Sequence, residues 1–173
     1  MWKMATHQCP CGYYNHPAKD CVCAPGKVRQ YLNRVSGPLL DRIDLHVEVT
    51  PVPFEAIAHT GERIPESSAT IRERVVKARA IQAARFAGAG ITTNAQMNTR
   101  LLNRYCKLDA DSLELLKTAM HRLHLSARAY DRILKVSRTI ADLQGAAAIS
   151  AAHLAEAIHY RSLDREQWGQ EYE

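Results

Sequence analysis

The sequence predicts a mainly α-helical protein, in which a cysteine-rich loop and a single strand precede a compact helical bundle. Three observations lead to this prediction. Helical periodicity runs from residue 67 almost to the end of the chain, apolar and polar residues alternate at Ile43–Val49, and residues 9–26 follow neither period. The chain has 173 residues, 46% of them hydrophobic, which is enough to bury a core of its own.

The composition indicates a mildly basic protein without membrane or secretion signals. A net charge of +5 permits contact with nucleic acid or phosphates, although a basic solvated surface is the commoner explanation. No apolar stretch is long enough to span a bilayer, and no apolar signal core follows the first residues. We therefore expect the cytoplasm, where the five cysteines are reduced or metal-bound rather than bridged.

The loop at residues 9–26 carries two C-x-C pairs, Cys9 with Cys11 and Cys21 with Cys23. Four thiolates can close a tetrahedral zinc site and replace the core that such a loop lacks. His16, between the pairs, is an alternative ligand. Reduced thiols and disulfides formed in vitro are the other possibilities, and spacing and compartment favour a structural zinc.

A short helix over Lys27–Val35 is expected after this loop, closed by Ser36-Gly37-Pro38. The strand Ile43–Val49 follows, with its odd-numbered apolar residues on one buried face, and Thr50-Pro51-Val52-Pro53 ends it. A lone strand cannot satisfy its backbone groups, and we find no convincing second strand. Either its sheet partners lie outside this chain, or the strand is marginal.

The helical half is expected to begin with a helix capped at Ser67, Ser68 or Thr70 and broken at Gly88-Ala89-Gly90. Its expected inner stripe is Ile71, Val75, Ala78 and Ile81.

Further helices are expected near 97–106, 110–122, 126–143 and 150–160. In the third of these, helical spacing predicts an inward face made by Tyr130, Ile133, Leu134, Ser137, Ile140 and Ala141. Ser150 is expected to cap the last helix, with Ile149 packing onto Leu154.

Arg42 stands just before the strand, between the carboxylates of Asp41 and Asp44. A guanidinium is permanently charged and forms bidentate contacts with phosphate oxygens, so an arginine placed in this way often reaches a phosphate across a subunit boundary. On the local pattern alone, a salt bridge with one of the two aspartates is the commoner explanation.

Arg128, Arg132 and Lys135 are spaced to lie on the helix face opposite the apolar stripe of 126–143. Arg128 falls in the first turn, where its charge opposes the helix dipole and a bound anion would offset the cost. The sequence contains no G-x-x-x-x-G-K-[ST] loop, no G-x-G-x-x-G fingerprint and no G-x-S-x-G motif. Catalysis by this chain alone is therefore not expected.

Four segments together resemble the magnesium-chelatase-like AAA+ ATPases of the YifB/ComM group: Cys9–Tyr14, Tyr31–Asp44, Leu125–Leu134 and the tail Leu154–Arg161. The resemblance runs from about residue 9 to 168. It implies ring-forming, hexameric ATPases with a Lon-protease-like domain, an α/β nucleotide core and a helical lid. This chain would then be the C-terminal part of the core, with its cysteine-rich loop and one strand, followed by the lid.

The resemblance also implies roles for individual residues. Arg42 matches the arginine finger that acts on the ATP of a neighbouring subunit, Arg128 matches the sensor 2 arginine, and Arg34 would assist at the same interface. The intact assembly would use ATP and Mg²⁺ and, as in ComM, act on DNA in branch migration during natural transformation. One departure is His7-Gln8, which stands where the family reads Asn-Pro and so leaves sensor 1 without its usual asparagine.

The expected organisation is a core remnant at 1–52, a linker at 53–66 and a helical lid domain at 67–168. Walker A and Walker B segments are absent from the sequence, so we expect the chain to be inactive alone and to work with a homo-oligomer or the rest of an AAA+ subunit. The alternative is a zinc-stabilised helical module that binds DNA or protein without nucleotide. A chelatase subunit proper is less favoured, since nothing in the sequence suggests a porphyrin site.

Overall fold

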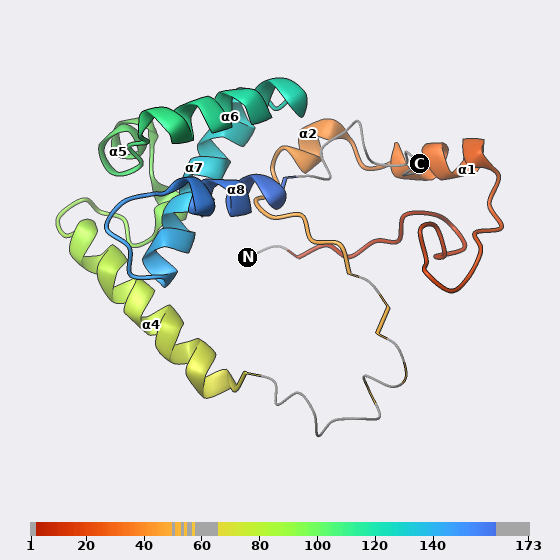
Figure 1. Cartoon of the computed structure of the whole chain (residues 1–173), viewed down its shortest axis with the longest axis horizontal. Coiled ribbons are helices and arrows are strands. Elements are labelled where there is room, and N and C mark those ends of the chain that lie inside the picture. Colours follow the sequence, from red (N-terminus) through yellow and green to blue (C-terminus); the bar gives the residue numbers. More distant parts are fainter. Residues whose placement is uncertain (1–2, 50, 53, 55–56, 58–65, 162–173) are drawn as a thin grey trace.

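The computed structural model describes residues 3–49, 51, 52, 54, 57 and 66–161. Within these residues all regular elements are helical and no strand is present, so the mainly α prediction is confirmed (Figure 1). The elements are α1 (Pro25–Leu32), α2 (Gly37–Leu40), α4 (Ser68–Arg85), the 3₁₀ turn η1 (Asn94–Gln96), α5 (Thr99–Tyr105), α6 (Ala110–Arg122), α7 (Ala127–Leu143) and α8 (Ala151–His159).

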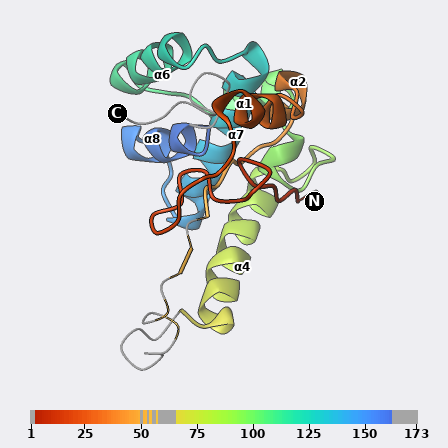
Figure 2. The ribbon, with the colours of Figure 1, turned by 90° about the vertical axis from the view of Figure 1, so that its right-hand side faces the viewer.

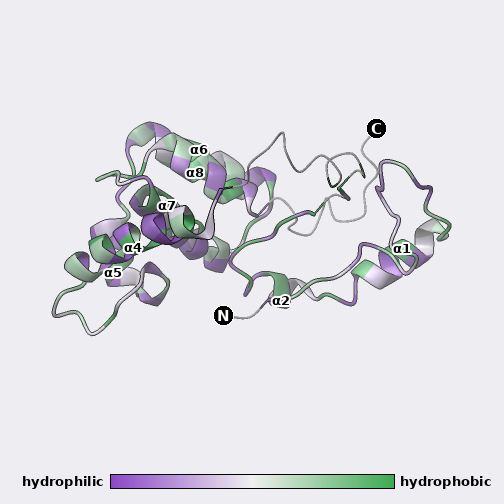
Figure 3. Cartoon of the chain, turned by 90° about the horizontal axis from the view of Figure 1, so that it is seen from below, coloured by the Kyte–Doolittle hydropathy of each residue, from purple (hydrophilic) through white to green (hydrophobic). Residues whose placement is uncertain are grey.

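Helix α7 is the centre of a bundle formed by the second half of the chain. It contacts α4, η1, α5 and α8, while α6 packs on α8. Most bundle helices carry both hydrophobic and hydrophilic residues, as amphipathic helices around a shared core do (Figure 3). The buried core consists of Phe86, Met97, Leu102, Cys106, Leu116, Ile133, Leu134, Ile140, Ile149, Leu154 and Ala157.

The predicted inward face of α7 is confirmed, and its one serine is buried with its hydroxyl hydrogen-bonded. Ile133, Leu134, Ile140 and Ala141 are buried and Tyr130 is partly buried. Ser137, also buried, satisfies its hydroxyl by donating to the carbonyl of Ile133 one turn earlier.

Each α-helix of the bundle begins with a side chain that accepts a hydrogen bond from a backbone N–H of the first turn. Such caps satisfy donors that have no partner inside the helix and thereby mark where the helix starts. The caps of α4, α5, α6, α7 and α8 are Ser67, Asn98, Asp109, Ser126 and Ser150. Local capping explains why the expected ranges of these helices lie within two residues of the observed ones.

The inner stripe predicted for α4 is largely wrong. Of its four residues only Ala78 is buried, together with Gln82, while Ile71, Val75 and Ile81 are exposed. The N-terminal half of α4, which includes Ile71 and Val75, extends away from the other helices of the bundle (Figures 1 and 2). Ile81 is in the C-terminal half but lies on a side of the helix that no other described element covers. A helix can bury only the part of its stripe that another element covers.

The first part of the chain is held by a second, much smaller cluster. Cys9, Val28 and Leu32 are buried there, with Cys11, Tyr14, Cys21 and Cys23 packed against them. This cluster joins the cysteine loop to α1, which lies with α2 on the opposite side of the molecule from α4 and α5 (Figure 1).

The strand predicted at Ile43–Val49 is not formed. The segment is extended but has no ladder partner among the described residues, and its supposed buried face is open: Leu45 is 48%, Val47 63% and Val49 85% exposed. His46, on the predicted polar face, is instead buried. A strand needs a neighbour to pair its backbone groups, so alternation alone produced an extended chain here.

The expected domain limits cannot be compared with the structure throughout. Most of the linker at 53–66 and residues 162–168 of the lid lie outside the described residues. Within the described part, no helix is both long and apolar enough to cross a bilayer.

Candidate functional site

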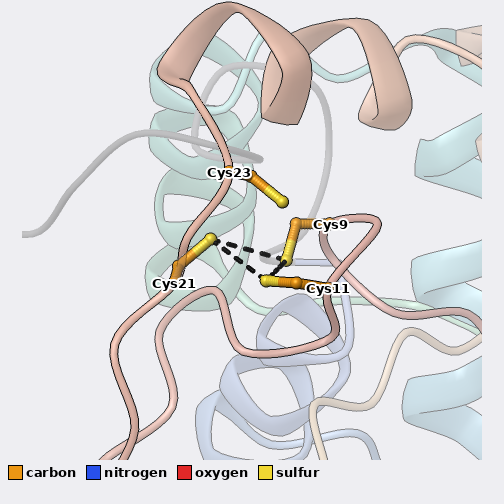
Figure 4. Close-up of side chains that lie close together, drawn as sticks. All are labelled: Cys9, Cys11, Cys21 and Cys23. Atoms are coloured by element: carbon orange, nitrogen blue, oxygen red, sulfur yellow. Dashed lines mark hydrogen bonds between the residues drawn. The ribbon is translucent and has the colours of Figure 1, made fainter.

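The four cysteines of the two C-x-C pairs converge on one point (Figure 4). The sulfur of Cys9 lies 3.3 Å from that of Cys11 and 3.6 Å from that of Cys21, and Cys11 and Cys21 are 3.5 Å apart. With Cys23 included, all four sulfurs lie within 4.8 Å of one another. The loop is thus closed around its sulfurs, as the C-x-C spacing predicted.

These distances fit a metal better than disulfides. All the cysteines are free, and a disulfide would require sulfurs about 2 Å apart. Four sulfurs at about 2.3 Å from a zinc ion define a tetrahedron with edges of about 3.8 Å. The three shortest separations, 3.3–3.6 Å, are slightly below that value and the others lie within 4.8 Å, so Cys9, Cys11, Cys21 and Cys23 could hold one tetrahedral ion.

His16, the alternative ligand, does not join the cluster. Its Nδ1 accepts a hydrogen bond from the backbone N–H of Ala18 at 3.1 Å, and its ring lies edge-on to Tyr13. The structure therefore brings together the four thiols and uses the histidine to shape the turn between the pairs.

Backbone groups polarise the thiols of this cluster. The backbone N–H of Tyr13 is the main cause that lowers the pKa of Cys11 to about 6. The backbone at Cys23 favours the thiolate of Cys21, but burial and hydrogen bonds with Cys11 and Cys9 outweigh it and raise the pKa of Cys21 to about 12. The thiolate of Cys11 is thus favoured at neutral pH, whereas Cys21 stays protonated as long as no cation shares the charge.

Arg42 lies in the turn that ends α2, and its side chain is exposed. It forms no ion pair with any residue that the structure describes. The two aspartates considered as its partners are taken by other arginines, because Asp41 faces Arg161 at 4.0 Å and Asp44 pairs with Arg132. The local salt bridge that the sequence pattern favoured is therefore not formed.

Arg128 is exposed in the first turn of α7, two residues after the cap Ser126. The other two basic residues of the expected row, Arg132 and Lys135, are engaged inside the protein: Arg132 pairs with Asp44, and Lys135 donates to the carbonyl of Ala95 at 3.1 Å. The row is thus not a continuous basic face, and Arg128 is its one member with neither an ion pair nor a side-chain hydrogen bond to a described residue.

Arg34 is exposed in the segment after α1, with its guanidinium 5.6 Å from the ring centre of Tyr31. Upstream, at the departure noted in the sequence, Gln8 donates its side-chain amide to Glu48 at 3.0 Å. Gln8 therefore links the cysteine loop to the extended segment after Arg42.

The sequence reasoning missed a buried ionic network between α4 and α7. Asp142 is 1% exposed and accepts hydrogen bonds from Arg85, from Asn94 at 2.8 Å and from Arg138 at 3.1 Å. Burial opposes the charge of Asp142, but the hydrogen bonds from Arg85 and Asn94 outweigh it and lower its pKa. The signal was present as Arg138 and Asp142, four residues apart within an otherwise apolar helix face.

The contacts of Arg161 were not predicted from the sequence either. This residue follows α8 and is almost completely buried. Nothing in the local pattern indicates where that guanidinium goes, because its partners Asp41 and Ile43 lie more than a hundred residues earlier.

Comparisons with known proteins place this arrangement in a family. The family model described as magnesium chelatase, subunit ChlI C-terminal, matches residues 65–161, and the model described as magnesium chelatase, subunit ChlI, matches residues 1–57. The chain is 46% identical to competence protein ComM of Haemophilus influenzae over 161 residues, which are 93% of this chain and 30% of ComM.

The YifB proteins of Salmonella typhimurium and Escherichia coli are 41% and 39% identical to the chain over 163 residues, again 93% of this chain and 30% of each relative. The chain thus spans less than a third of the length of the curated relatives that it matches. The first family model alone covers more than half of the chain. The chain therefore belongs to the magnesium-chelatase-like family that also contains ComM and YifB.

Proposed function

We propose that this chain supplies Arg42 as an arginine finger and Arg128 as a sensor 2 arginine to ATP hydrolysis in a ring-shaped AAA+ motor. The observation that carries the proposal is the exposure of Arg42 and its lack of an ion pair with the described residues. Its guanidinium is exposed and has no ion pair with a described residue, although carboxylates stand one residue before it and two residues after it. Those carboxylates are held by Arg161 and Arg132, which leaves the charge of Arg42 available to an outside anion.

The chemistry suits a guanidinium in this state. When ATP is hydrolysed, negative charge shifts over the oxygens of the γ-phosphate and onto the leaving group. A permanently charged, planar donor set that reaches in from a neighbouring subunit stabilises that charge and accelerates the reaction by about 10³–10⁵-fold in enzymes that use one. Arg42 would act in trans in this way on the ATP of the adjacent subunit, with Mg²⁺ bound to the same nucleotide.

Arg128 has the position expected of a phosphate sensor at the start of a helix. The positive end of the α7 dipole repels its guanidinium, and a phosphate held there would relieve that cost. Arg34, exposed beside Tyr31, would assist at the same subunit interface.

For the cysteine cluster we propose a structural zinc ion bound by Cys9, Cys11, Cys21 and Cys23. Four protein ligands leave no open position for substrate, so the ion would hold the loop rather than take part in hydrolysis. The sulfur separations and the small size of the local core support this assignment, because three buried residues alone are a weak basis for ordering the loop.

DNA is the proposed substrate of the intact motor. The support is the similarity to a relative whose printed name is competence protein ComM, together with the positive net charge of the chain. On that basis the motor would drive branch migration of DNA during natural transformation, as a hexamer or similar ring.

The test mixes this chain with full-length ComM subunits of Haemophilus influenzae and measures the ATPase rate. We expect the wild-type chain to change the rate by entering the ring, and Arg42→Ala to abolish any stimulation, because the finger acts on the neighbour's ATP. Arg79→Ala, which alters an exposed arginine of α4, is the matched control. Equal rates with wild-type chain and Arg42→Ala, when both are shown to co-assemble, would contradict a trans-acting Arg42.

The alternative is a zinc-stabilised module that binds DNA or protein without nucleotide, which the cysteine cluster also supports. It predicts DNA binding that weakens with salt and does not change in Arg42→Ala or Arg128→Ala. That outcome, combined with no effect of the chain on the ATPase rate, would favour the module over the motor.

A further inference from the structure

Arg161 is a fully buried charged side chain, 1% exposed, directly after α8. Arginines are almost never buried to this extent unless their charge is paired, because removal of a guanidinium from water is costly. The contacts of Arg161 therefore indicate its structural role.

The guanidinium of Arg161 holds the residues on both sides of Arg42. One nitrogen donates to the backbone carbonyl of Ile43, and another lies 4.0 Å from the carboxylate of Asp41. One planar guanidinium thus contacts the residue before Arg42 through its carboxylate and the residue after it through its carbonyl, so a shift of the turn would disturb these contacts.

Two further contacts fasten the same stretch to the bundle. Arg132 of α7 pairs with Asp44, and the backbone N–H of His46 donates to the carbonyl of Tyr160 at 2.8 Å. Arg132 is one helical turn after Arg128, so the segment that carries Arg42 is joined to the helix that carries Arg128.

The turn itself is ordered by local backbone bonds. The N–H groups of Asp41, Arg42 and Ile43 donate to the carbonyls of Gly37, Leu39 and Leu40 at 2.9, 3.0 and 3.0 Å. The backbone of the turn is therefore fixed by hydrogen bonds, while the Arg42 side chain remains exposed.

Two arginines and two aspartates meet between the turn and the bundle. Burial and the charge of Arg161 lower the pKa of Arg132, and Asp41 acts in the opposite direction.

We propose that Arg161, supported by Arg132, is a positioning residue that clamps the Arg42 turn to the helical bundle, so that Arg42 and Arg128 are presented by one rigid unit. The effect on hydrolysis rests on the function proposed above for Arg42, whereas the clamp itself rests only on the contacts of Arg161 and Arg132. Any movement of α7 on nucleotide binding would then be transmitted to Arg42.

Amide hydrogen exchange of this chain tests the clamp without any nucleotide. In Arg161→Ala we expect the amides of Arg42, Ile43 and His46 to exchange about tenfold faster or more, while amides inside α7 such as that of Ser137 keep their rate. Arg161→Lys retains the charge but lacks the planar pair of donors, so it should restore only part of the protection. Arg79→Ala should change none of these rates.

A uniform rise that includes α7 would mean that Arg161 merely stabilises the bundle, and unchanged exchange at 42–46 would overturn the clamp. A charge reversal tests the second link if Arg161→Ala does not fold. Arg132→Asp and Asp44→Arg should each accelerate exchange at His46, and the double variant should restore it. Failure of the double variant to restore it would remove Arg132 from the proposal.

The mixed-ring ATPase assay tests the positioning role. We expect Arg161→Ala to lower kcat with little change in KM, and to add nothing when combined with Arg42→Ala, because both act through one group. Full activity of a well-folded Arg161→Ala chain, alongside an inactive Arg42→Ala chain, would overturn positioning. Arg42→Ala could instead leave the ATPase rate unchanged while Arg161→Ala still loses amide protection at residues 42–46. That result would contradict the proposed role of Arg42 in hydrolysis but support the structural role of Arg161.

Discussion

The helical bundle and the cysteine-rich segment are held together by different physical means. The bundle has eleven residues in its buried core cluster, side-chain caps on its helices and an ionic network around Asp142. The segment at 9–40 has a buried cluster of three residues, and neither α1 nor α2 has a side-chain cap. The bundle can therefore be stable through its own packing, whereas we infer that the segment needs its sulfur cluster to be ordered.

This contrast also separates the candidate sites. Arg128 lies on the self-stabilised bundle, whereas Arg42 lies in the turn between the 9–40 segment and the bundle. Each prediction below is meant to disturb one region and leave the other unchanged, and they run from the largest expected effect to the smallest.

Removal of the proposed zinc, by a chelator or by Cys9→Ser, should disorder the cysteine loop and α1. Structural zinc contributes an apparent free energy of about 10–16 kcal/mol in small zinc-binding peptides, far more than three buried residues provide. Zinc content and amide exchange check this, and we expect loss of protection over residues 9–32 with none lost in α7.

Cys106→Ala is the matched control, because that cysteine is buried in the bundle core and lies outside the cluster. It should leave the zinc content and the loop unchanged. Protection over residues 9–32 that survives complete metal removal would contradict a metal-dependent loop.

Asp142→Asn should lower the free energy of unfolding of the bundle by about 3–5 kcal/mol, because it leaves Arg85 and Arg138 buried without their counter-charge. Urea unfolding followed by far-ultraviolet circular dichroism measures this. The exposed Glu156 of α8 provides the control Glu156→Gln, which should be near neutral. A loss of zinc in Asp142→Asn would show that the two regions are coupled more closely than we infer.

Acid should weaken the bundle through the same carboxylate. The pKa of Asp142 is lowered in the folded state, so its contribution to stability is present above the unfolded-state pKa of about 3.9 and is lost as the pH falls further. Urea midpoints measured between about pH 6 and pH 3 should fall for the wild-type chain and fall less for Asp142→Asn. Parallel curves for the two proteins would assign the acid sensitivity to other groups.

The smallest effects concern the helix caps. Asp109 accepts a hydrogen bond from the backbone N–H of Ser112 at 2.8 Å, and Asp109→Ala should cost about 1 kcal/mol of bundle stability. Ala24 occupies the cap position of α1 without such a bond, so Ala24→Ser should stabilise that helix by up to about 1 kcal/mol.

Thermal unfolding of the metal-bound chain and amide exchange in α1 measure the two cap variants. If Ala24→Ser leaves the amide exchange rates of α1 unchanged, then the absence of a cap does not limit the stability of this helix.

Features that depend on near neighbours in the chain could be predicted from the sequence. Helix α6 occupies the expected residues 110–122, α7 begins within one residue of its expected start, and Ser150 caps α8 as expected. Periodicity and capping act over one or two turns, so the pattern contains the information. The meeting of the four cysteines was likewise anticipated, because two C-x-C pairs on one loop can supply the four ligands of a single metal ion.

Two of the failed expectations concern apolar surfaces whose burial depends on elements far away in the chain. Alternation at Ile43–Val49 predicted a buried strand face, but burial requires a second strand that the described chain does not provide. The apolar stripe of α4 is buried only at Ala78, since the N-terminal half of that helix extends beyond the bundle.

The sequence by itself thus determined the helices, the cysteine cluster and the family. Only the tertiary structure decided which charged side chains form ion pairs within the protein and which remain exposed to solvent. Asp41, Asp44 and Asp142 are claimed by arginines 120, 88 and 57 residues away, and no local pattern encodes pairs at such separations. Those pairings leave Arg42 exposed, because the carboxylates that flank it in the chain are bound to other arginines in the fold.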